Sequence, residues 1–205
     1  MGRNNFNILI VGVGGQGIIL AIEILAWAAL RENYRVRTAE THGMAQRGGS
    51  VASFLRFGNI IEGPLIPRGN CQIIIAFEAT EAVRNFNYAD SNTIFLINDK
   101  VIVPPTIHLL DMEYPNREAI QKFLYQISPN VFFINGHEEA LNAGDLRTLN
   151  VFMLGVLLGL EILPINEGTL KRSILRFVPE KAQNINKIAF QRGIEKGKLI
   201  RRDLK

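Results

Sequence analysis

The chain has 205 residues, of which 47% are hydrophobic and 20% are charged, a composition typical of a globular protein with a sizeable core. The longest apolar stretches, 18–30 and 151–165, are shorter than the roughly 18 residues that a membrane-spanning helix requires, and each contains a glutamate. The N-terminal segment lacks the apolar region and cleavage site of an export signal, so we expect a cytoplasmic protein. Cys71 is the only cysteine, which excludes an internal disulfide and any four-cysteine iron–sulfur or zinc site made by this chain alone.

The net charge of +4 hides an uneven distribution of basic residues. Residues 171–205 contain eleven Lys and Arg against three Asp and Glu, whereas the rest of the chain has a net negative charge. A solvated helical face is the preferred interpretation of this basic block. The alternatives are contact with an acidic partner surface, with phosphates or with nucleic acid. Nucleic acid is not favoured, because the sequence has no aromatic-rich RNA motif and no zinc finger.

The N-terminal part of the chain predicts a strand, a glycine turn and a helix. Residues 7–11 (NILIV) are apolar and rich in β-branched side chains, 12–17 (GVGGQG) form the turn, and 18–31 have the length and composition of a helix. Two further strands are expected at 35–40 and 51–57, separated by an irregular polar segment.

The middle of the chain continues the alternation of strands and helices. Residues 72–77 and 93–98 are near-continuous apolar runs, as expected of parallel strands that are covered on both faces. A helical segment at 80–86 lies between them, which gives a β-α-β unit.

Two more strands and a long helical region complete the prediction. The strands are expected at 106–110 and 131–134, on either side of a helix that is capped by Asn116 and runs to Ile127. From about residue 147 the chain is predicted to be helical. We therefore expect one domain that spans all 205 residues, a three-layer α/β/α Rossmann-like fold with a mostly parallel sheet of six or seven strands and a helical C-terminal region.

The turn at 12–17 fits the pattern G-x-G-x-x-G, and it lies directly after a strand and at the start of a helix. Glycines permit positive φ angles and let backbone N–H groups approach an anion, and the helix N-terminus adds a favourable field. A phosphate, a pyrophosphate or a carboxylate could bind there. The alternative is that the glycines only allow the strand and the helix to pack closely. A Walker A loop is excluded, because Ile18 rather than a lysine follows the last glycine.

Glu40 favours a competing interpretation of the same turn. A dinucleotide-binding fold places an acidic residue for the ribose at the end of the second strand, roughly 20 residues beyond the glycine loop, and Glu40 is close to that position. The chain would then be a stand-alone NAD(P)- or FAD-binding oxidoreductase. A non-enzymatic ligand-binding module that uses the basic C-terminal block is a further alternative.

The segment 41–50 (THGMAQRGGS) is unusual for a dinucleotide-binding fold, because it is polar and glycine-rich and carries one imidazole and one guanidinium. Arg47 could hold a phosphate or a carboxylate through its planar guanidinium, with a surface or interface ion pair as the alternative. His42 and Gln46 could face the same site, although a hydrogen-bonded structural role is the preferred interpretation of His42.

Six stretches of the chain resemble the gamma-type subunits and domains of 2-oxoacid:ferredoxin oxidoreductases, and most closely the beta subunits of the indolepyruvate enzymes. The glycine turn alone is weakly specific, but its pairing at this spacing with HGMAQRGGSV is strongly specific. The HGMAQRGG form resembles the arylpyruvate branch, whereas pyruvate and 2-oxoglutarate relatives tend to have other residues before the shared RGG. The stretches cover nearly the whole chain and are NILIVGVGGQG (7–17), ETHGMAQRGGSV (40–51), PLIPRG (64–69), AFE (76–78), LNVFMLG (149–155) and NINKIAFQRG (184–193).

The resemblance implies a subunit of an enzyme that decarboxylates a 2-oxoacid with thiamine diphosphate and Mg²⁺, passes electrons through [4Fe-4S] clusters to ferredoxin and releases an acyl-CoA. This chain has no GDG-type thiamine diphosphate motif and only one cysteine. We therefore expect the cofactor and the clusters on a larger catalytic subunit, no metal site in this chain, no activity of the chain alone, and neither a membrane nor nucleic acid as its partner.

The glycine turn and the Arg47 segment are expected to shape a crevice at the carboxyl ends of the strands, near the active site of the partner. The residues expected to bind a cofactor or CoA there are Gly12, Gly14, Gly15, Gln16, Gly17, Arg47, Gly48, Gly49 and Ser50, with His42, Gln46 and Arg47 as weak catalytic candidates.

Other polar residues have structural explanations that we prefer. Glu78 ends a strand and is expected to cap the next helix rather than bind a ligand, and Cys71 is expected to be a buried structural cysteine rather than a nucleophile. Arg147 and Asn150 precede a very apolar helix and are interpreted as capping groups, and His137 has no metal-ligand spacing and is given no role.

Overall fold

A six-stranded sheet forms the centre of the computed structural model, which describes residues 5–42, 49–101 and 114–204. The strand order is β2-β3-β1-β4-β5-β6, and only β3 runs antiparallel to its neighbours. The mostly parallel sheet is therefore confirmed, while the strand expected at 106–110 lies outside the described residues. The strands are β1 (Asn5–Val13), β2 (Arg35–His42), β3 (Ser50–Gly58), β4 (Cys71–Ala76), β5 (Ala89–Asn98) and β6 (Val131–Ile134).

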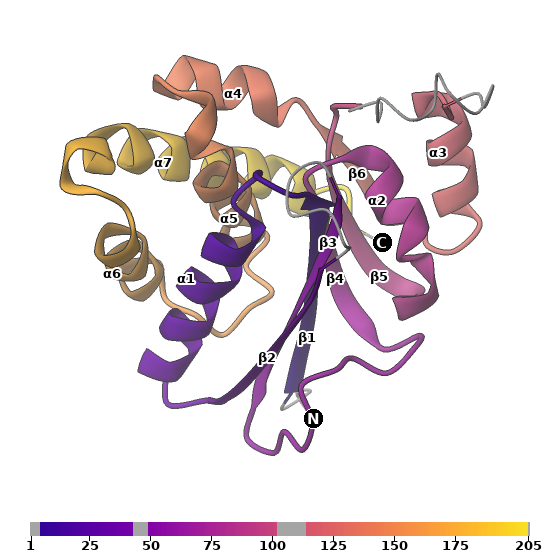
Figure 1. Cartoon of the computed structure of the whole chain (residues 1–205), viewed down its shortest axis with the longest axis horizontal. Coiled ribbons are helices and arrows are strands. Elements are labelled where there is room, and N and C mark those ends of the chain that lie inside the picture. Colours follow the sequence, from indigo (N-terminus) through magenta and orange to yellow (C-terminus); the bar gives the residue numbers. More distant parts are fainter. Residues whose placement is uncertain (1–4, 43–48, 102–113, 205) are drawn as a thin grey trace.

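Helices cover both faces of the sheet, which confirms the three-layer α/β/α arrangement (Figure 1). One face carries α2 (Ala79–Arg84) and α3 (Arg117–Tyr125). The other face carries the N-terminal helix and the helical C-terminal region, namely α1 (Ile18–Arg31), α4 (Gly136–Ala143), α5 (Leu149–Gly159), α6 (Glu167–Phe177) and α7 (Gln183–Arg201). None of the helices in the described ranges is long and apolar enough to cross a membrane. The organisation of the chain as one domain stays a prediction.

The central strands are apolar on both sides because each side meets a layer of helices. In β1, Ile8 and Ile10 face the layer of α1 and α5, whereas Leu9 and Val11 face the layer of α2 and α3, and all four are fully buried. The same alternation of two buried faces holds for β4 and β5. Burial of both sides of these strands confirms the prediction, made from the near-continuous apolar runs, that they are covered on both faces.

Strand β3 separates β1 from β2, and this placement decides against the dinucleotide interpretation. In the common dinucleotide-binding order, the second strand lies directly beside the first, so that its terminal acid reaches the ribose. Here Glu40 lies in β2 and pairs with Ser53 of β3. Because β3 lies between β2 and β1, Glu40 is two strand spacings, or about 10 Å, from β1. Glu40 is therefore one strand further from the glycine turn than a ribose-binding acid should be.

Helices α5 and α7 cross at glycines, which let the two backbones come into direct contact. Gly155 faces Gly193 and Gly159 faces Gly197, so the two helices run in the same direction with their backbones in contact. A Cβ atom at Gly193 would lie 2.9 Å from the Cα of Gly155 and even closer to the carbonyl oxygen of Phe152. Helix α5 is buried along its whole length within this chain, so its apolar sequence serves the core.

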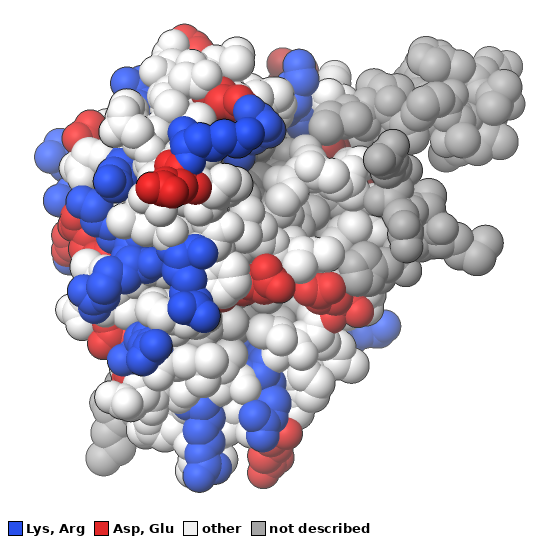
Figure 2. Space-filling view, turned by 60° about the vertical axis from the view of Figure 1, so that its left-hand side comes forward, with Lys and Arg blue, Asp and Glu red and all other residues white. Residues whose placement is uncertain are grey.

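The basic C-terminal block lies on the outside of α6 and α7. Figure 2, turned to bring the α1, α6 and α7 side of Figure 1 forward, shows Lys and Arg gathered on this side and interspersed with Asp and Glu. Arg201 pairs with Glu161, and Arg176 lies 5.7 Å from the ring centre of Trp27, the only tryptophan. Most of the other basic side chains on these helices are exposed, as in a solvated helical face.

Candidate functional site

The glycine turn joins β1 to α1 through two residues with positive φ, Gly15 at 102° and Gly17 at 76°. The side chain of Gln16 folds back under the turn, where its Oε1 accepts a hydrogen bond from the Val13 N–H at 2.7 Å. The turn is also tied to the start of β3, because the N–H of Gly14 donates to the carbonyl oxygen of Gly49 at 2.9 Å.

The first N–H groups of α1, as in every α-helix, have no carbonyl acceptor within the helix. Gly17 occupies the N-cap position and has no side chain that could accept from them. A Cβ atom at Gly17 would lie 2.8 Å from Nδ2 of Asn150 at the start of α5, so the turn and α5 approach each other closely. The absence of a side-chain cap leaves the positive end of a 14-residue helix available to an anion.

A two-lobed crevice opens beside the turn, between α1 and the C-terminal helices. The turn lobe has a volume of about 440 Å³ and is lined by Gly15, Gln16, Gly17, His137, Leu146 and Leu149. The helix lobe, of about 430 Å³, is lined by Thr148, Val178, Pro179, Lys181, Ala182, Ile185 and Asn186. Leu20, Arg147 and Asn150 line both lobes, which makes the crevice continuous.

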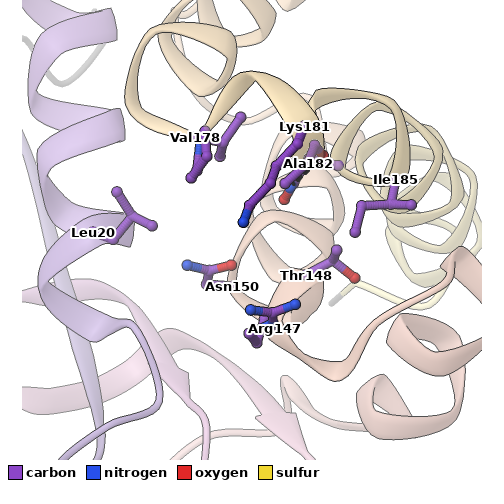
Figure 3. Close-up of a pocket in the computed structure, with 10 residues that line it drawn as sticks. Leu20, Arg147, Thr148, Asn150, Val178, Lys181, Ala182 and Ile185 are labelled. Carbon is purple, nitrogen blue, oxygen red and sulfur yellow. Dashed lines mark hydrogen bonds between the residues drawn. The ribbon is translucent and has the colours of Figure 1, made fainter.

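Figure 3 shows the helix lobe between α1 and the start of α7. Leu20 of α1 stands on one side, and Lys181, Ala182 and Ile185 stand across from it, with Arg147 and Asn150 between the two sides. The nitrogen of the Asn150 side chain is turned toward Leu20. Apolar walls with a few polar groups between them are typical of sites for small molecules.

A chain of hydrogen bonds links the turn to His137 across the carboxyl ends of three parallel strands. The carbonyl oxygen of Phe77, after β4, accepts from Nε2 of Gln16 at 3.2 Å and from Nδ2 of Asn98, at the end of β5, at 3.0 Å. A carbonyl can only accept, so the atom of Asn98 that meets Phe77 is the amide nitrogen, Nδ2. This same Nδ2 lies 3.0 Å from Nδ1 of His137 and also donates to it. Nδ1 of His137 therefore accepts, and its proton is on Nε2.

The protonation state of His137 follows from its surroundings. Partial burial, with a smaller contribution from the positive charge of Lys100, lowers the pKa of His137 below its ordinary value of 6.5. The ring is neutral at pH 7 and presents Nε2–H as a hydrogen-bond donor.

Arg147 brings a positive charge to the shared part of the crevice. Its guanidinium pairs with Asp145, with Nη2 at 2.6 Å from Oδ2, and this pairing holds the pKa of Asp145 at about 2. Asp145 itself caps the short 3-10 helix Leu146–Thr148 by accepting from the Arg147 N–H at 2.8 Å. The N-cap residue of α5 itself is Thr148, which makes no side-chain capping hydrogen bond, so the expectation that Arg147 and Asn150 cap this helix is wrong.

Comparison with known proteins gives the family of this fold and site. The family model of pyruvate ferredoxin/flavodoxin oxidoreductases matches residues 7–196. The chain belongs to this family. It is 37% identical over 194 residues to indolepyruvate oxidoreductase subunit IorB of Thermococcus kodakarensis, and the match covers 94% of this chain and 96% of that relative. The IorB subunit of Pyrococcus horikoshii matches with the same identity and coverage.

Solved structures of the oxidoreductase family share the fold. The gamma subunit of a keto/oxoacid ferredoxin oxidoreductase from Geobacter sulfurreducens superposes with a TM-score of 0.68 at 21% identity, over 95% of this chain and 99% of that one. The 2-oxoglutarate:ferredoxin oxidoreductase of Magnetococcus marinus, solved with 2-oxoglutarate, coenzyme A and succinyl-CoA bound, matches with a TM-score of 0.70 at 22% identity. That match covers the whole of this chain and 32% of the other, so the fold forms part of a larger protein there.

The structure places some but not all of the site residues expected from the sequence. Gln46, Arg47 and Gly48 lie outside the described residues. His42 ends β2 opposite Val51 of β3. Gly49 lies beside the turn through its hydrogen bond with Gly14.

Ser50 turns to the other face of the sheet, where its hydroxyl donates to Oε2 of Glu81 at 2.5 Å. Glu78 caps α2 by accepting from the Glu81 N–H at 3.2 Å and also accepts from the Tyr114 hydroxyl at 2.8 Å, so the predicted capping role is confirmed. Among the described residues, no group of three or more His, Cys, Asp or Glu is placed to hold a metal ion.

Sequence reasoning missed or dismissed three residues here: Asn98, which is hydrogen-bonded to His137, and His137 and Lys181, which line the crevice. They come from the end of β5, the first turn of α4 and the segment before α7, so no local motif joins them. The one available signal was position: Asn98, like Glu78, is a polar residue directly at the carboxyl end of a buried strand, where ligand sites of α/β sheets lie.

Glu81 should make the stability of the oxidoreductase subunit depend on pH. Burial is the largest influence on the carboxyl of Glu81 and raises its pKa above 4.5. The hydrogen bond from Ser50 and the positive charge of Arg84 lower the pKa, but by less. The stability contributed by the neutral carboxyl is thus complete below 4.5 and is lost as pH rises through the raised pKa. Glu81→Gln keeps an acceptor for Ser50 without a charge, so we expect it to unfold like the wild type in acid and to be more stable at neutral pH. Urea titrations at a series of pH values from acid to neutral measure the free energy of unfolding of the wild type and of Glu81→Gln. A difference between the two proteins that does not change with pH would contradict the expectation.

Cys71 should be inert in the folded chain. It is 1% exposed, and burial raises its pKa to about 12, so the reactive thiolate is scarce at neutral pH. We expect iodoacetamide to leave the native chain unmodified and to add one group per chain after unfolding in urea, as read by mass spectrometry. Stoichiometric modification of the native chain would show that Cys71 is accessible.

Proposed function

We propose that this chain is the small subunit of an indolepyruvate:ferredoxin oxidoreductase, which converts an arylpyruvate and CoA to an aryl-acyl-CoA. The observation that carries the proposal is the 37% identity to two IorB subunits over 94% of this chain and 96% of each relative. A match that runs through both chains almost completely favours the same role rather than a shared domain in unrelated proteins.

The cofactors belong to a larger partner subunit in this proposal. The single cysteine of the chain is too few for an iron–sulfur cluster, and no thiamine diphosphate motif is present in the sequence. Thiamine diphosphate, Mg²⁺ and [4Fe-4S] clusters would thus be held by the large subunit, and ferredoxin would accept the electrons in the reducing cytoplasm. When bound, thiamine diphosphate supplies the carbanion chemistry of decarboxylation.

The glycine turn is the proposed contribution of this chain to CoA binding. Gly12, Gly14, Gly15, Gln16 and Gly17 would approach an anionic group of CoA with their backbone, beside Arg47, Gly48, Gly49 and Ser50 from the neighbouring segment. The Gly14–Gly49 hydrogen bond supports this pairing of the two segments, and the uncapped end of α1 supports an anion as the ligand. Ser50 would act by holding the start of β3, since its hydroxyl is engaged by Glu81. His42, Gln46 and Arg47 remain the proposed candidates for direct contact with substrate.

The substrate preference of the purified complex tests the proposal. The chain is copurified with its large subunit and assayed for ferredoxin reduction with indolepyruvate, phenylpyruvate, pyruvate and 2-oxoglutarate in the presence of CoA. We expect kcat/KM to be at least about tenfold higher for the two arylpyruvates, since filling an apolar pocket with an aromatic ring is worth more than 1.4 kcal/mol. Equal rates on all four acids would refute the arylpyruvate assignment.

A further inference from the structure

The carboxyl of Glu81 is buried in the first turn of α2, on the face of the sheet opposite to α1 (Figure 1). Glu81 is 5% exposed, and its two oxygens meet different partners. Oε2 accepts from the Ser50 hydroxyl at 2.5 Å, and Oε1 lies 3.2 Å from Nε of Arg84. The side chain of Arg84 is 61% exposed, so this ion pair contributes little to stability. The hydrogen bond from Ser50 is therefore the main contact that offsets the cost of burying Glu81.

Capping of α2 does not explain the position of Glu81, because Glu78 already serves as the cap. Glu78 accepts from the Glu81 N–H at 3.2 Å, and the Tyr114 hydroxyl donates to Oε1 of Glu78 at 2.8 Å. The Thr80 hydroxyl donates to Oε2 of the same carboxylate. These bonds fix the first turn of α2 and with it the backbone of Glu81. The side chain of Glu81 takes no part in the cap and is held toward Ser50.

Ser50 lies where β3 meets the glycine turn. It pairs with Val13, the last residue of β1, and its neighbour Gly49 extends this pairing by accepting from the Gly14 N–H at 2.9 Å. One peptide bond thus separates the residue that Glu81 holds from the carbonyl oxygen that holds the turn. A continuous series of contacts runs from Glu81, on one face of the sheet, to Gly14 in the turn.

We propose that Glu81 is a positioning residue for the glycine turn, on which it acts through Ser50 and Gly49. By holding the Ser50 hydroxyl, Glu81 fixes the carbonyl oxygen of Gly49 and so the backbone of the turn at Gly14. The inference rests on the proposed function for the ligand of the turn, CoA. It adds to that function a buried carboxyl on the opposite face of the sheet, which touches neither CoA nor the substrate.

The KM for CoA of Ser50→Ala and of Glu81→Ala tests the proposal. Each variant is assembled with the large subunit and assayed for ferredoxin reduction with indolepyruvate. We expect each to raise the KM for CoA about fivefold or more, as for the loss of a hydrogen bond that holds a binding group, and to change kcat by less than about twofold. The split is expected because the turn contacts CoA while the partner carries the chemistry. Glu81→Gln keeps an acceptor for Ser50 and should restore the wild-type KM.

The double variant Ser50→Ala/Glu81→Ala tests the route. If Glu81 acts through Ser50, both single variants remove the same contact, and the double variant should have the KM of either one. A KM raised by the product of the two single effects would show that the residues act independently and would overturn the route.

Ser128→Ala is the matched control for a general loss of stability. Its hydroxyl also makes one short hydrogen bond, to the carbonyl oxygen of Thr93 at 2.7 Å, but it lies before the amino end of β6, whereas the turn lies at the carboxyl ends of the strands. We expect Ser128→Ala to be less stable than the wild type and to keep its KM for CoA. An equal rise in KM for Ser128→Ala and Ser50→Ala would overturn the positioning role.

Ser50→Ala decides the test if Glu81→Ala does not fold, as judged by Trp27 fluorescence, because Ser50 is exposed and its replacement leaves the core intact. An unchanged KM for CoA in Ser50→Ala would overturn the proposal. Gly17→Ala, which alters the turn directly, then separates the two claims. A raised KM for CoA in Gly17→Ala would uphold the proposed function of the turn without Glu81, and an unchanged one would count against that function itself.

Discussion

Gly193→Ala is expected to lower the free energy of unfolding by about 2 kcal/mol or more. The new methyl group would lie 2.9 Å from the Cα of Gly155, and the atoms it meets belong to the backbone of α5, which cannot rotate away as a side chain can. The two helices must therefore move apart along a contact that is buried throughout. Overpacking of this kind costs about 1–3 kcal/mol, and the better helix propensity of alanine returns less than about 1 kcal/mol.

Gly168→Ala provides the matched control for this helix crossing. It is also a glycine-to-alanine change within a helix, but the nearest atom to the new methyl group is the end of the Arg172 side chain at 3.5 Å. We expect it to be neutral or slightly stabilising. Thermal unfolding followed by Trp27 fluorescence compares the two, and a difference of 2 kcal/mol corresponds to about 4–8 °C in a domain of this size. Equal midpoints would show that α5 and α7 are not in the close contact described.

Gly17→Ala is expected to reduce the activity of the assembled enzyme by about tenfold or more. Gly17 has a φ of 76°, a conformation that costs other residues about 1–2 kcal/mol. The methyl group would also lie 2.8 Å from Nδ2 of Asn150 and would displace that side chain from the crevice. Displacements of about 1 Å in a positioned group can lower rates up to about a hundredfold.

The loss should be seen in steady-state kinetics of the complex with CoA and an arylpyruvate. Gly63→Ala is the control, because a Cβ atom at Gly63 meets nothing within 4 Å, and it should retain the wild-type rate. If Gly17→Ala folded, assembled and worked as well as Gly63→Ala, neither the turn nor Asn150 would contribute to the function of the enzyme.

The elements of the fold could be predicted where the chemistry is local. Asn116 accepts from the Ala119 N–H at 2.9 Å and so starts α3 where the sequence places it. The strand order could not be predicted in the same way, since it depends on pairing between distant segments. The polar composition of 35–40 nevertheless fits the edge position of β2, and the fuller burial of β3 fits its place inside the sheet.

The site could be predicted only in part. The glycine turn and its closeness to Gly49 follow from motifs within the first 50 residues. The opposite wall is built by residues from three C-terminal segments, and Asn150 lies beside the turn only because α5 approaches Gly17 closely. Such a wall arises from tertiary packing and has no signature in a single sequence.

Ferredoxin reduction by the separated and recombined subunits tests the central claim most directly. The claim is that this chain completes a two-subunit enzyme whose cofactors lie on the larger partner. With indolepyruvate, CoA and ferredoxin, we predict no turnover by this chain alone, little by the large subunit alone, and full turnover when the two are mixed. Turnover by the isolated chain, or an undiminished rate of the large subunit without it, would contradict the claim.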